Sequence, residues 1–392
     1  MKTFMIVLCI MGANLALFAQ ENINSALASI EENNATLKAL RETAEAQKLE
    51  NKAGTYLPGP EADFNYLWGN PSIIGNRTDF SVSQTFDIPA ITGMRSRVAQ
   101  AKNHLEDRQY RTDRMSILLE AKQYCIEMVY YNALMKELLI RLQHAQTIAE
   151  GYKERLDKGD AGILEYNKAY LNLSTVQGEI SRVEVERNAL LLQLKRLNGG
   201  MDLALPDTEY SEPDLPADFD EWFLQAEDKN PALAYVKQEV EVSKRQLSLS
   251  KAMGWPSLST GYMSESVVGQ RYGGVSLGIS IPLWGNKNRV RQAKASVVAA
   301  QSRQADGRQQ LYSRLRILYD RVSGLKATAG NYRSSLANVN STDLLRKALD
   351  AGQISLLEYM VEMGLYYDTV NRILEAERDY RKAYAELSSA EL

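Results

Sequence analysis

Few side chains in this sequence could carry out covalent chemistry or hold a metal ion. The chain has two histidines and two cysteines. His104 and His144 lie forty residues apart in one helical stretch, and neither has a Cys or His neighbour in the sequence. The sequence contains no Cys/His cluster, no nucleophile elbow and no glycine loop of the phosphate-binding kind. It therefore predicts a protein that is not an enzyme, with no cofactor and no metal site.

The acidic residue with the clearest context is Glu358, which follows Ser355 by three positions. Ser-x-x-Glu is the capping-box pattern, in which both side chains satisfy backbone N–H groups at the start of a helix. This pattern predicts that Ser355 and Glu358 cap the helix expected over 355–390.

The composition is that of an ordinary folded protein rather than a nucleic-acid-binding one. The 392 residues are 45% hydrophobic and 24% charged, and the formal net charge is -3, so no basic excess is present. Lys2, the apolar stretch from Phe4 to Phe18 and the small Ala19 predict a cleavable signal peptide over residues 1–19. A buried first helix is the alternative. Cys9 lies inside the apolar stretch, so we do not expect a lipoprotein.

An internal repeat with an offset of about 193 residues organises the rest of the chain. Short motifs recur at this offset: Leu156 and Leu349, Gly159 and Gly352, Tyr166 and Tyr359. The motif Asn34–Leu37 is matched by Asn230–Leu233. We therefore expect a duplication, with repeat 1 over residues 20–198, a linker or equatorial segment over 199–216, and repeat 2 over 217–392.

Each repeat is expected to run helix, two strands, long helix, helix. No proline occurs between Pro89 and Pro206 or after Pro282, which favours long helices. Apolar residues in these stretches alternate steps of four and three, as in a coiled coil: Leu138, Leu142, Ala145, Ala149, Tyr152 and Leu156. The predicted helices cover 21–53, 93–158, 163–198, 217–253, 286–351 and 355–390, and the predicted strands cover about 57–68, 79–88, 256–264 and 272–284.

The predicted strands alternate apolar and polar side chains and have the length that crosses a bilayer in a tilted barrel. The polar side includes four serines, Ser81, Ser83, Ser276 and Ser280, which are predicted to line a lumen. Four strands cannot close a barrel, and an open edge cannot lie in lipid. Three chains would supply twelve strands. Small soluble hairpins packed on helices are the alternative.

The chain resembles the TolC family of outer-membrane efflux proteins over essentially its whole mature length. The order of elements carries the resemblance, together with Asn230–Leu233, Trp255–Leu258, Ile281–Gly285 and the two glycine turns that precede Leu-Glu-Tyr. The resemblance implies a mainly α fold with a small β part. In this fold a trimer builds a periplasmic α-barrel of coiled-coil helices and a shared twelve-stranded β-barrel in outer-membrane lipid.

The same resemblance implies a function and partners. The function is the exit duct of a tripartite efflux pump or of a type I secretion system. The partners are a periplasmic adaptor (membrane fusion) protein and, through it, an inner-membrane transporter of the RND or ABC type, with no nucleic acid. The location is the outer membrane of a Gram-negative bacterium, extending into the periplasm.

The resemblance also assigns residues. The two turns are expected to meet the adaptor, although a plain helix–helix turn would use the same glycines; they contain Gly159, Asp160, Gly162, Gly352, Gln353 and Ser355. Glu358 and Glu362 are expected to form acidic rings at the periplasmic aperture. For Glu358 this role is compatible with the capping box, and the sequence leaves both open. Ile354 stands where some family members carry an arginine that helps to lock the aperture, so we expect closure to differ here.

The main alternative is a secreted coiled-coil scaffold without a membrane barrel. It accounts for the heptads and the export signal but not for paired strands of bilayer length in both repeats. The sequence does not indicate the cargo, because a duct accepts what its inner-membrane partner delivers.

Overall fold

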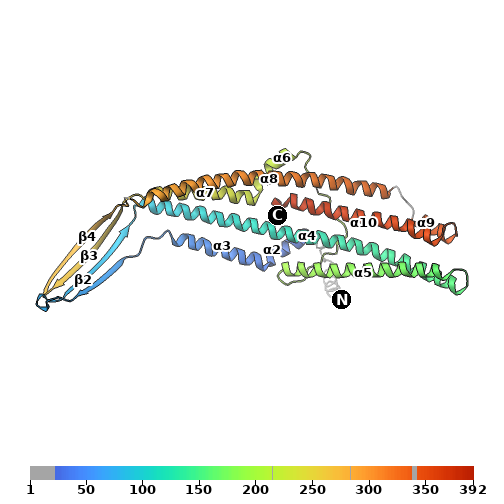
Figure 1. Cartoon of the computed structure of the whole chain (residues 1–392), viewed down its shortest axis with the longest axis horizontal. Helices are drawn as coiled ribbons and strands as arrows, with labels where there is room; N and C mark the ends of the chain where they lie inside the picture. Colours follow the sequence, from blue (N-terminus) through green and yellow to red (C-terminus); the bar gives the residue numbers. More distant parts are fainter. Residues whose placement is uncertain (1–22, 214, 283, 338–341) are drawn as a thin grey trace, which may run out of the picture. The chain divides into compact units, whose positions relative to one another are not determined.

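The computed structural model describes residues 23–213, 215–282, 284–337 and 342–392. The predicted signal peptide, residues 1–19, lies outside the described residues. The chain divides into two compact units. Unit 1 contains the described residues up to Lys38, together with Arg114–Trp222 and Arg314–Leu392, and unit 2 contains Ala39–Asp113 and Phe223–Ser313. Figure 1 shows the elements in chain order.

Unit 2 contains a four-stranded antiparallel sheet. Its strands are β1 (Glu61–Leu67), β2 (Arg77–Phe86), β3 (Ser257–Val267) and β4 (Gln270–Ser280), in the order β1-β2-β3-β4. The other elements of unit 2 are α7 (Pro231–Ala252), most of α3 (Ala35–Ala53) and the first parts of α4 (Pro89–Asp157) and α8 (Asn286–Ala337). These helices connect to the sheet at one and the same end of it (Figure 1).

The second hairpin is tighter than the sequence predicts. A turn of about seven residues was expected between strands at 256–264 and 272–284, but only Val268 and Gly269 separate β3 from β4. Both have positive φ, at 45° and 78°, as the two central residues of a type I′ turn require. A β-branched residue is unfavourable at positive φ, and for this reason the sequence does not reveal the turn. The predicted extension of the last strand to 284 is wrong, since β4 ends at Ser280.

The pairing register sorts the strand residues onto two faces. Directly opposed residues lie on the same face of a sheet, and Phe64 opposes Phe80, Val82 opposes Tyr262, and Tyr262 opposes Val275. We call this side the apolar face; it also carries Phe86, Leu258, Leu277 and Ile279. No part of the chain that the structure describes covers the apolar face: Val275 is 77% exposed and Leu277 84%.

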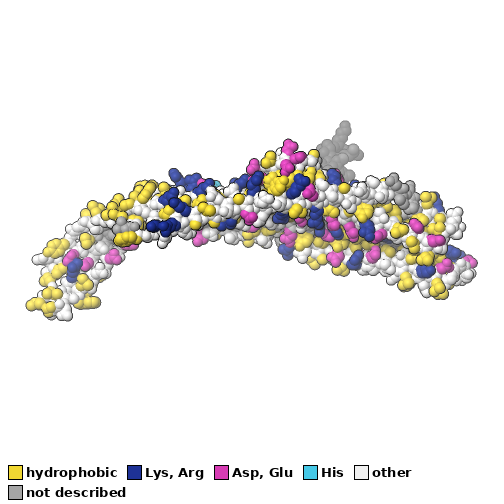
Figure 2. All heavy atoms as spheres, turned by 45° about the horizontal axis from the view of Figure 1, so that its top comes forward, with side chains coloured by type: hydrophobic (Ala, Val, Ile, Leu, Met, Phe, Trp, Pro, Cys, Tyr) yellow, Lys and Arg dark blue, Asp and Glu magenta, His cyan; other side chains and the backbone are white. Residues whose placement is uncertain are grey.

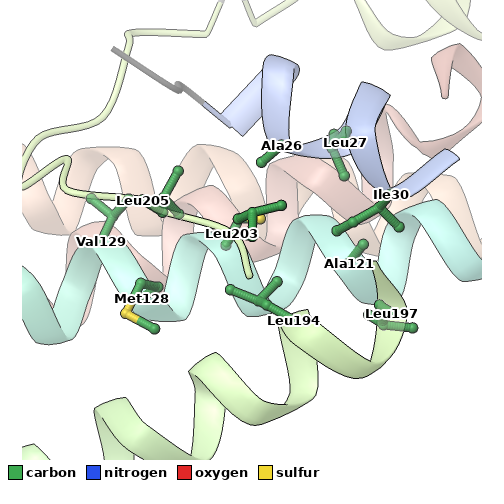
Figure 3. Close-up of a cluster of buried hydrophobic side chains, with 11 residues drawn as sticks. Ala26, Leu27, Ile30, Ala121, Met128, Val129, Leu194, Leu197, Leu203 and Leu205 are labelled. Carbon is green, nitrogen blue, oxygen red and sulfur yellow. The ribbon is translucent and has the colours of Figure 1, made fainter. Parts of the chain in front are cut away.

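Unit 1 is a bundle of helices with a buried hydrophobic core. Its elements are α2 (Ile23–Asn33), α5 (Ile163–Leu197), α9 (Thr342–Asp350), α10 (Leu356–Leu387) and the remaining parts of α4 and α8. Hydrophobic side chains from α2, α4, α5 and the segment after α5 pack against one another in this core (Figure 3): Ala26, Leu27, Ile30, Ala121, Cys125, Met128, Val129, Leu194, Leu197, Leu203 and Leu205. Leu203 and Leu205 belong to the predicted linker, so that segment is packed onto the bundle.

The longest element is α4, with 69 residues, or about 100 Å at ~1.5 Å per residue. The helix predicted over 286–351 is described as α8 and α9, with residues 338–341 outside the described residues. No helix among the described residues is both long enough and apolar enough to span a bilayer.

Two predicted helices are each divided in two. The helix predicted over 21–53 is α2 and α3, which meet at Asn34, and the helix predicted over 217–253 is α6 (Phe219–Lys229) and α7, which meet at Asn230. The Asn34 Oδ1 accepts a hydrogen bond from the Leu37 N–H at 2.8 Å. The Asn230 Oδ1 accepts one from the Leu233 N–H at 3.1 Å. Each asparagine therefore starts a new helix as its N-cap.

The two caps should differ in their contribution to stability. Asn34→Ala should lower the free energy of unfolding by about 2 kcal/mol, because the Asn34 Nδ2 also donates to the buried Leu197 carbonyl at 2.7 Å. Asn230→Ala should cost about 1 kcal/mol, since no second bond of this kind supports it among the described residues. Denaturant titration of the two purified variants measures both values, and equal losses would contradict the assignment of the second bond.

Candidate functional site

Two turns at one end of unit 1 share the same backbone geometry. The turn after α4 has Gly159 at φ 79°, and the turn after α9 has Gly352 at φ 68°. In the first, the Asp160 N–H donates to the Arg155 carbonyl at 2.7 Å. In the second, the Gln353 N–H donates to the Ala348 carbonyl at 2.8 Å. Together with the bonds from the glycine N–H groups to Leu156 and Leu349, these are Schellman motifs, which end a helix with a left-handed residue.

The helices that follow the turns also begin alike. Before α10, the Glu358 Oε2 accepts from the Ser355 N–H and hydroxyl, both at 2.8 Å, and the Ser355 Oγ accepts from the Glu358 N–H at 3.2 Å. The capping-box interpretation is therefore confirmed. Before α5, the Glu165 Oε2 accepts from the Gly162 N–H at 3.0 Å. Because Gly162 has no side chain, that start has only half of the box.

A buried cluster holds the two turns together. It joins α4, α5, α9 and α10 through Ala149, Tyr152, Ala169, Leu349, Leu356, Tyr359 and Met363. Ile354 packs against this cluster and is half-buried. Ile354 is thus part of the packing that fixes the second turn.

The acidic side chains at this end are exposed. Glu358 and Glu362 both lie at the surface of α10, one helical turn apart. The hydrogen bonds from Ser355 lower the pKa of Glu358 below its ordinary value, so its carboxylate is charged at neutral pH. Glu165 is the exposed counterpart of Glu358 on α5 and was not singled out from the sequence. The repeated Leu-Glu-Tyr at the 193-residue offset was the signal that would have found it.

A cavity of about 630 Å³ adjoins the second turn. Aromatic and basic side chains from α4, α9 and α10 line it, among them Tyr152, Arg155, Arg346 and Tyr359. The Arg155 guanidinium lies 5.0 Å from the centre of the Tyr152 ring. Arg346 and Arg155 are exposed, so this surface offers both apolar area and positive charge to a partner.

Further along the bundle, a buried arginine joins α4 to α10. Arg141 is only 4% exposed; its Nη2 donates to the Asn371 Oδ1 at 2.8 Å and its guanidinium lies 4.5 Å from the Tyr367 ring centre. The Tyr367 hydroxyl is 3.0 Å from the His144 Nδ1. Burial lowers the pKa of Arg141 and raises that of Tyr367. His144 thus takes part in a helix–helix contact, which the sequence did not indicate.

The four predicted lumen serines lie on one face of the sheet in unit 2. Ser83 opposes Gly261, which opposes Ser276, and Ser257 opposes Ser280. Ser81 lies two residues from Ser83 and so shares its face. This polar face is the side opposite to the apolar face. The register therefore brings the four residues together, although they come from two distant parts of the chain.

The described residues contain no group of three or more His, Cys, Asp or Glu side chains placed to hold a metal ion. Residues Gly274–Gly278 match the Gly-x-Ser-x-Gly sequence pattern of some hydrolases. They lie within β4, however, and a nucleophile elbow needs a turn between a strand and a helix.

Comparison with known proteins identifies relatives of one kind. The model of the family described as "Outer membrane efflux protein" matches residues 222–390. The alkaline protease secretion protein AprF of Pseudomonas aeruginosa is 25% identical, in a match that covers 77% of this chain and 66% of AprF. The chain thus spans slightly less than two thirds of the length of that curated relative.

Solved structures share the fold at low sequence identity. A membrane protein from Pseudomonas aeruginosa superposes with a TM-score of 0.76 at 14% identity, covering 96% of this chain and 97% of that one. The CmeC outer membrane channel of Campylobacter jejuni superposes with a TM-score of 0.70 at 16% identity, covering 94% and 85%. The mostly helical fold with a small sheet is therefore that of known outer membrane channels.

The two left-handed glycines can be tested against a matched control. Gly352→Ala should lower the free energy of unfolding by about 1 kcal/mol, because φ 68° is strained for any residue with a Cβ even though no atom lies within 4 Å. Gly364→Ala, at an exposed position within α10 with equally open space, should raise it by about 0.5–1 kcal/mol. Thermal or denaturant unfolding measures both, and a neutral Gly352→Ala would argue against the Schellman turn.

Proposed function

Because the model of the outer membrane efflux protein family matches residues 222–390 and the fold is that of known outer membrane channels, we propose that three copies of this chain form an exit duct through the outer membrane. The duct serves a tripartite efflux pump or a type I secretion system. The observation that carries the proposal is the sheet of unit 2, which has one uncovered apolar face, one polar face and two unpaired edges.

The apolar face requires an apolar environment. Leaving large side chains such as Leu277 in water forfeits roughly 1.5–3 kcal/mol each relative to burial. Lipid can cover this face only if the strand edges that lie in the lipid have hydrogen-bond partners for their backbone groups. The sheet order leaves β1 and β4 as edges among the described strands. Pairing β4 of one copy with β1 of the next would close a twelve-stranded barrel with the serines Ser81, Ser83, Ser276 and Ser280 inside.

A second apolar stripe, in unit 1, supports an assembly of copies. On α5, one seam packs within the chain through Ala169, Val176 and Val183. A different row of the same helix repeats every seven residues and is 64–71% exposed: Leu164, Leu171, Val185 and Leu192. Gly178 occupies the remaining position of this row. A seven-residue apolar row is the pattern of a helix that packs on a second helix, and we assign that partner to a neighbouring subunit.

The two glycine turns are the proposed contact with a periplasmic adaptor. Identical Schellman geometry at positions 193 residues apart supports two equivalent docking loops, as expected of a duplicated chain. The residues concerned are Gly159, Asp160, Gly162, Gly352, Gln353 and Ser355. The cavity beside the second turn, with its exposed Arg155 and Arg346, suits an acidic helical hairpin of that partner.

The aperture is assigned to the acidic residues at the same end. Glu358 and Glu362, repeated three times about a common axis, would surround the opening with negative charge. Glu165 adds a third candidate. Ile354 replaces the locking arginine of some relatives and packs into the cluster that holds the turn, so closure here would rest on packing rather than on an ion pair.

The cargo would be set by the inner-membrane transporter, of the RND or ABC type, that loads the duct through the adaptor. AprF is named for the secretion of a protease, which is compatible with a type I secretion role here. Members of this family are channels rather than enzymes, and the proposed work of the chain is passage without covalent chemistry.

Trimer formation is the first test. Expressed in a Gram-negative host, the chain should be recovered from the outer membrane, and light scattering of the detergent extract should give three chains per particle. Val185→Glu should shift the particle to monomers, because it places a charge in the exposed seven-residue row. Gln177→Glu, an exposed change on α5 that is not three or four residues from any member of the row, should leave the trimer intact. A soluble monomer or dimer of the unaltered chain would favour a coiled-coil scaffold instead.

Cation block tests the acidic aperture. In planar bilayers, Glu358→Gln should raise the multivalent-cation concentration that halves the conductance by more than about tenfold, since three charges worth about 1 kcal/mol each are lost. Glutamine keeps the capping bond, so the helix start is preserved. Glu154 lies near the first turn, at the same end of unit 1, but is already paired with Lys158 at 2.7 Å, and Glu154→Gln should change the block little. An unchanged block in Glu358→Gln would remove Glu358 from the aperture.

A further inference from the structure

A cavity of about 660 Å³ lies in unit 2 where the strands meet the helices. We call it the junction cavity. Its lining is predominantly apolar, with only a few polar groups: Leu57, Phe86, Asp87, Ile88, Pro89, Thr92, Gly93, Ser96 and Leu258. Neither the adaptor contact nor the aperture uses any of these residues.

The junction cavity is continuous with the apolar face of the sheet. Phe86 opposes Leu258, and Leu258 opposes Ile279, so the two cavity residues belong to the last row of that face. Phe86 is 42% exposed and Leu258 55%. A hydrocarbon chain that lies along the apolar face would therefore meet the cavity without crossing a polar barrier.

Positive charge begins directly beyond the junction cavity. No Asp or Glu occurs in residues 88–105, 242–256 or 286–305, which are the sheet-side parts of α4, α7 and α8 with the residues next to them. These segments carry eleven Lys and Arg residues: Arg95, Arg97, Lys102, Lys244, Arg245, Lys251, Lys287, Arg289, Arg291, Lys294 and Arg303. Figure 2 shows Lys and Arg side chains gathered on the helices of unit 2, beside the apolar side chains at the end of the sheet. A band of this sign next to an apolar surface complements a plane of phosphate groups.

Arg97 is the basic residue best placed to hold a phosphate group at the junction cavity. Gly93 lines the cavity, and Arg97 follows it by one helical turn on the same side of α4. Helical side chains lean toward the N-terminus, which directs Arg97 toward the cavity. Arg95 is already engaged, with its Nη1 2.5 Å from the Asp87 Oδ2. Arg97 is exposed and forms no ion pair within the described part of the chain.

We propose that the junction cavity binds one acyl chain of a glycerophospholipid whose phosphate is held by Arg97. The proposal rests on the proposed membrane location. The occupant is a lipid rather than a second copy of the chain because the cavity joins an apolar face to a cationic band, which is the polarity profile of a single lipid molecule. The bound lipid would fix the level at which unit 2 sits in the inner leaflet.

Native mass spectrometry of the detergent-extracted protein with added phosphatidylglycerol tests this. The unaltered chain should retain one lipid per subunit after collisional removal of detergent. Gly93→Leu should abolish retention by filling the cavity, and its side chain should fit because no atom lies within 4 Å of the added Cβ. Arg97→Gln should weaken phosphatidylglycerol retention about fivefold, the effect of one basic residue at an anionic surface.

The repeat offers matched controls. Gly285 and Arg289 follow β4 as Gly93 and Arg97 follow β2, and Gly285 also has open space around its Cβ position. Gly285→Leu and Arg289→Gln should leave lipid retention unchanged. Equal losses in the control variants would show that the lipid binds the surface generally and would overturn the assignment to the cavity.

The same spectra also give the number of subunits per particle, which distinguishes a failure of the proposed lipid site from a failure of the proposed function. An intact outer-membrane trimer without retained lipid would refute the lipid site alone. Dissociation of the trimer by Gly93→Leu would identify the junction cavity as a subunit contact and overturn the proposal. Recovery of the unaltered chain outside the membrane would refute the proposed function itself.

Discussion

Backbone hydrogen bonding at the ends and edges of elements is the constraint on which this structure depends. The sheet of unit 2 leaves the N–H and C=O groups of β1 and β4 unpaired on their outer sides. In water, the large hydrophobic side chains of its apolar face would stay exposed to solvent. In lipid, the unpaired backbone groups of its two edges would have no hydrogen-bond partners. Pairing with strands of further copies would resolve both demands, and the proposed assembly of several chains follows from this constraint.

The backbone groups at the helix ends also need hydrogen-bond partners, and corresponding residues of the two repeats supply them. Gly159 and Gly352 close α4 and α9 with left-handed residues, and Asn34 and Asn230 start α3 and α7 with side-chain caps. Each of these residues has its counterpart at nearly the same offset in the chain. The matching geometry is what a duplicated gene would produce, because the capping residues and the bonds they make are inherited together.

Contacts between the long helices of unit 1 fix how these helices are placed relative to one another. Within unit 1, the cluster around Leu349, Leu356 and Tyr359 makes the two turns one surface rather than two loops. Arg141 and Tyr367 add a polar contact between α4 and α10 further along the same bundle. A buried guanidinium is unfavourable without partners, so this contact favours one relative placement of the two helices. Adaptor docking and aperture geometry would both depend on it.

The sequence alone determined the periodicity, the repeat, the turn glycines and the Ser355–Glu358 cap, because these features depend on residues close together in the chain. It also led to the four serines being assigned to one surface, through the alternation of the strands. It did not reveal the interruption at Asn34, since an internal asparagine is tolerated by many helices and packing decides whether it caps. The interruption at Asn230 did have a local signal, because Pro231 takes the first position of α7, but the predicted helix ran through it. It missed the Val268–Gly269 turn for a related reason: pairing of β3 with β4 imposes a conformation that valine disfavours locally. The junction cavity and the Arg141 contact were decided only by the tertiary structure, because each joins residues that are distant in the sequence and carry no common pattern.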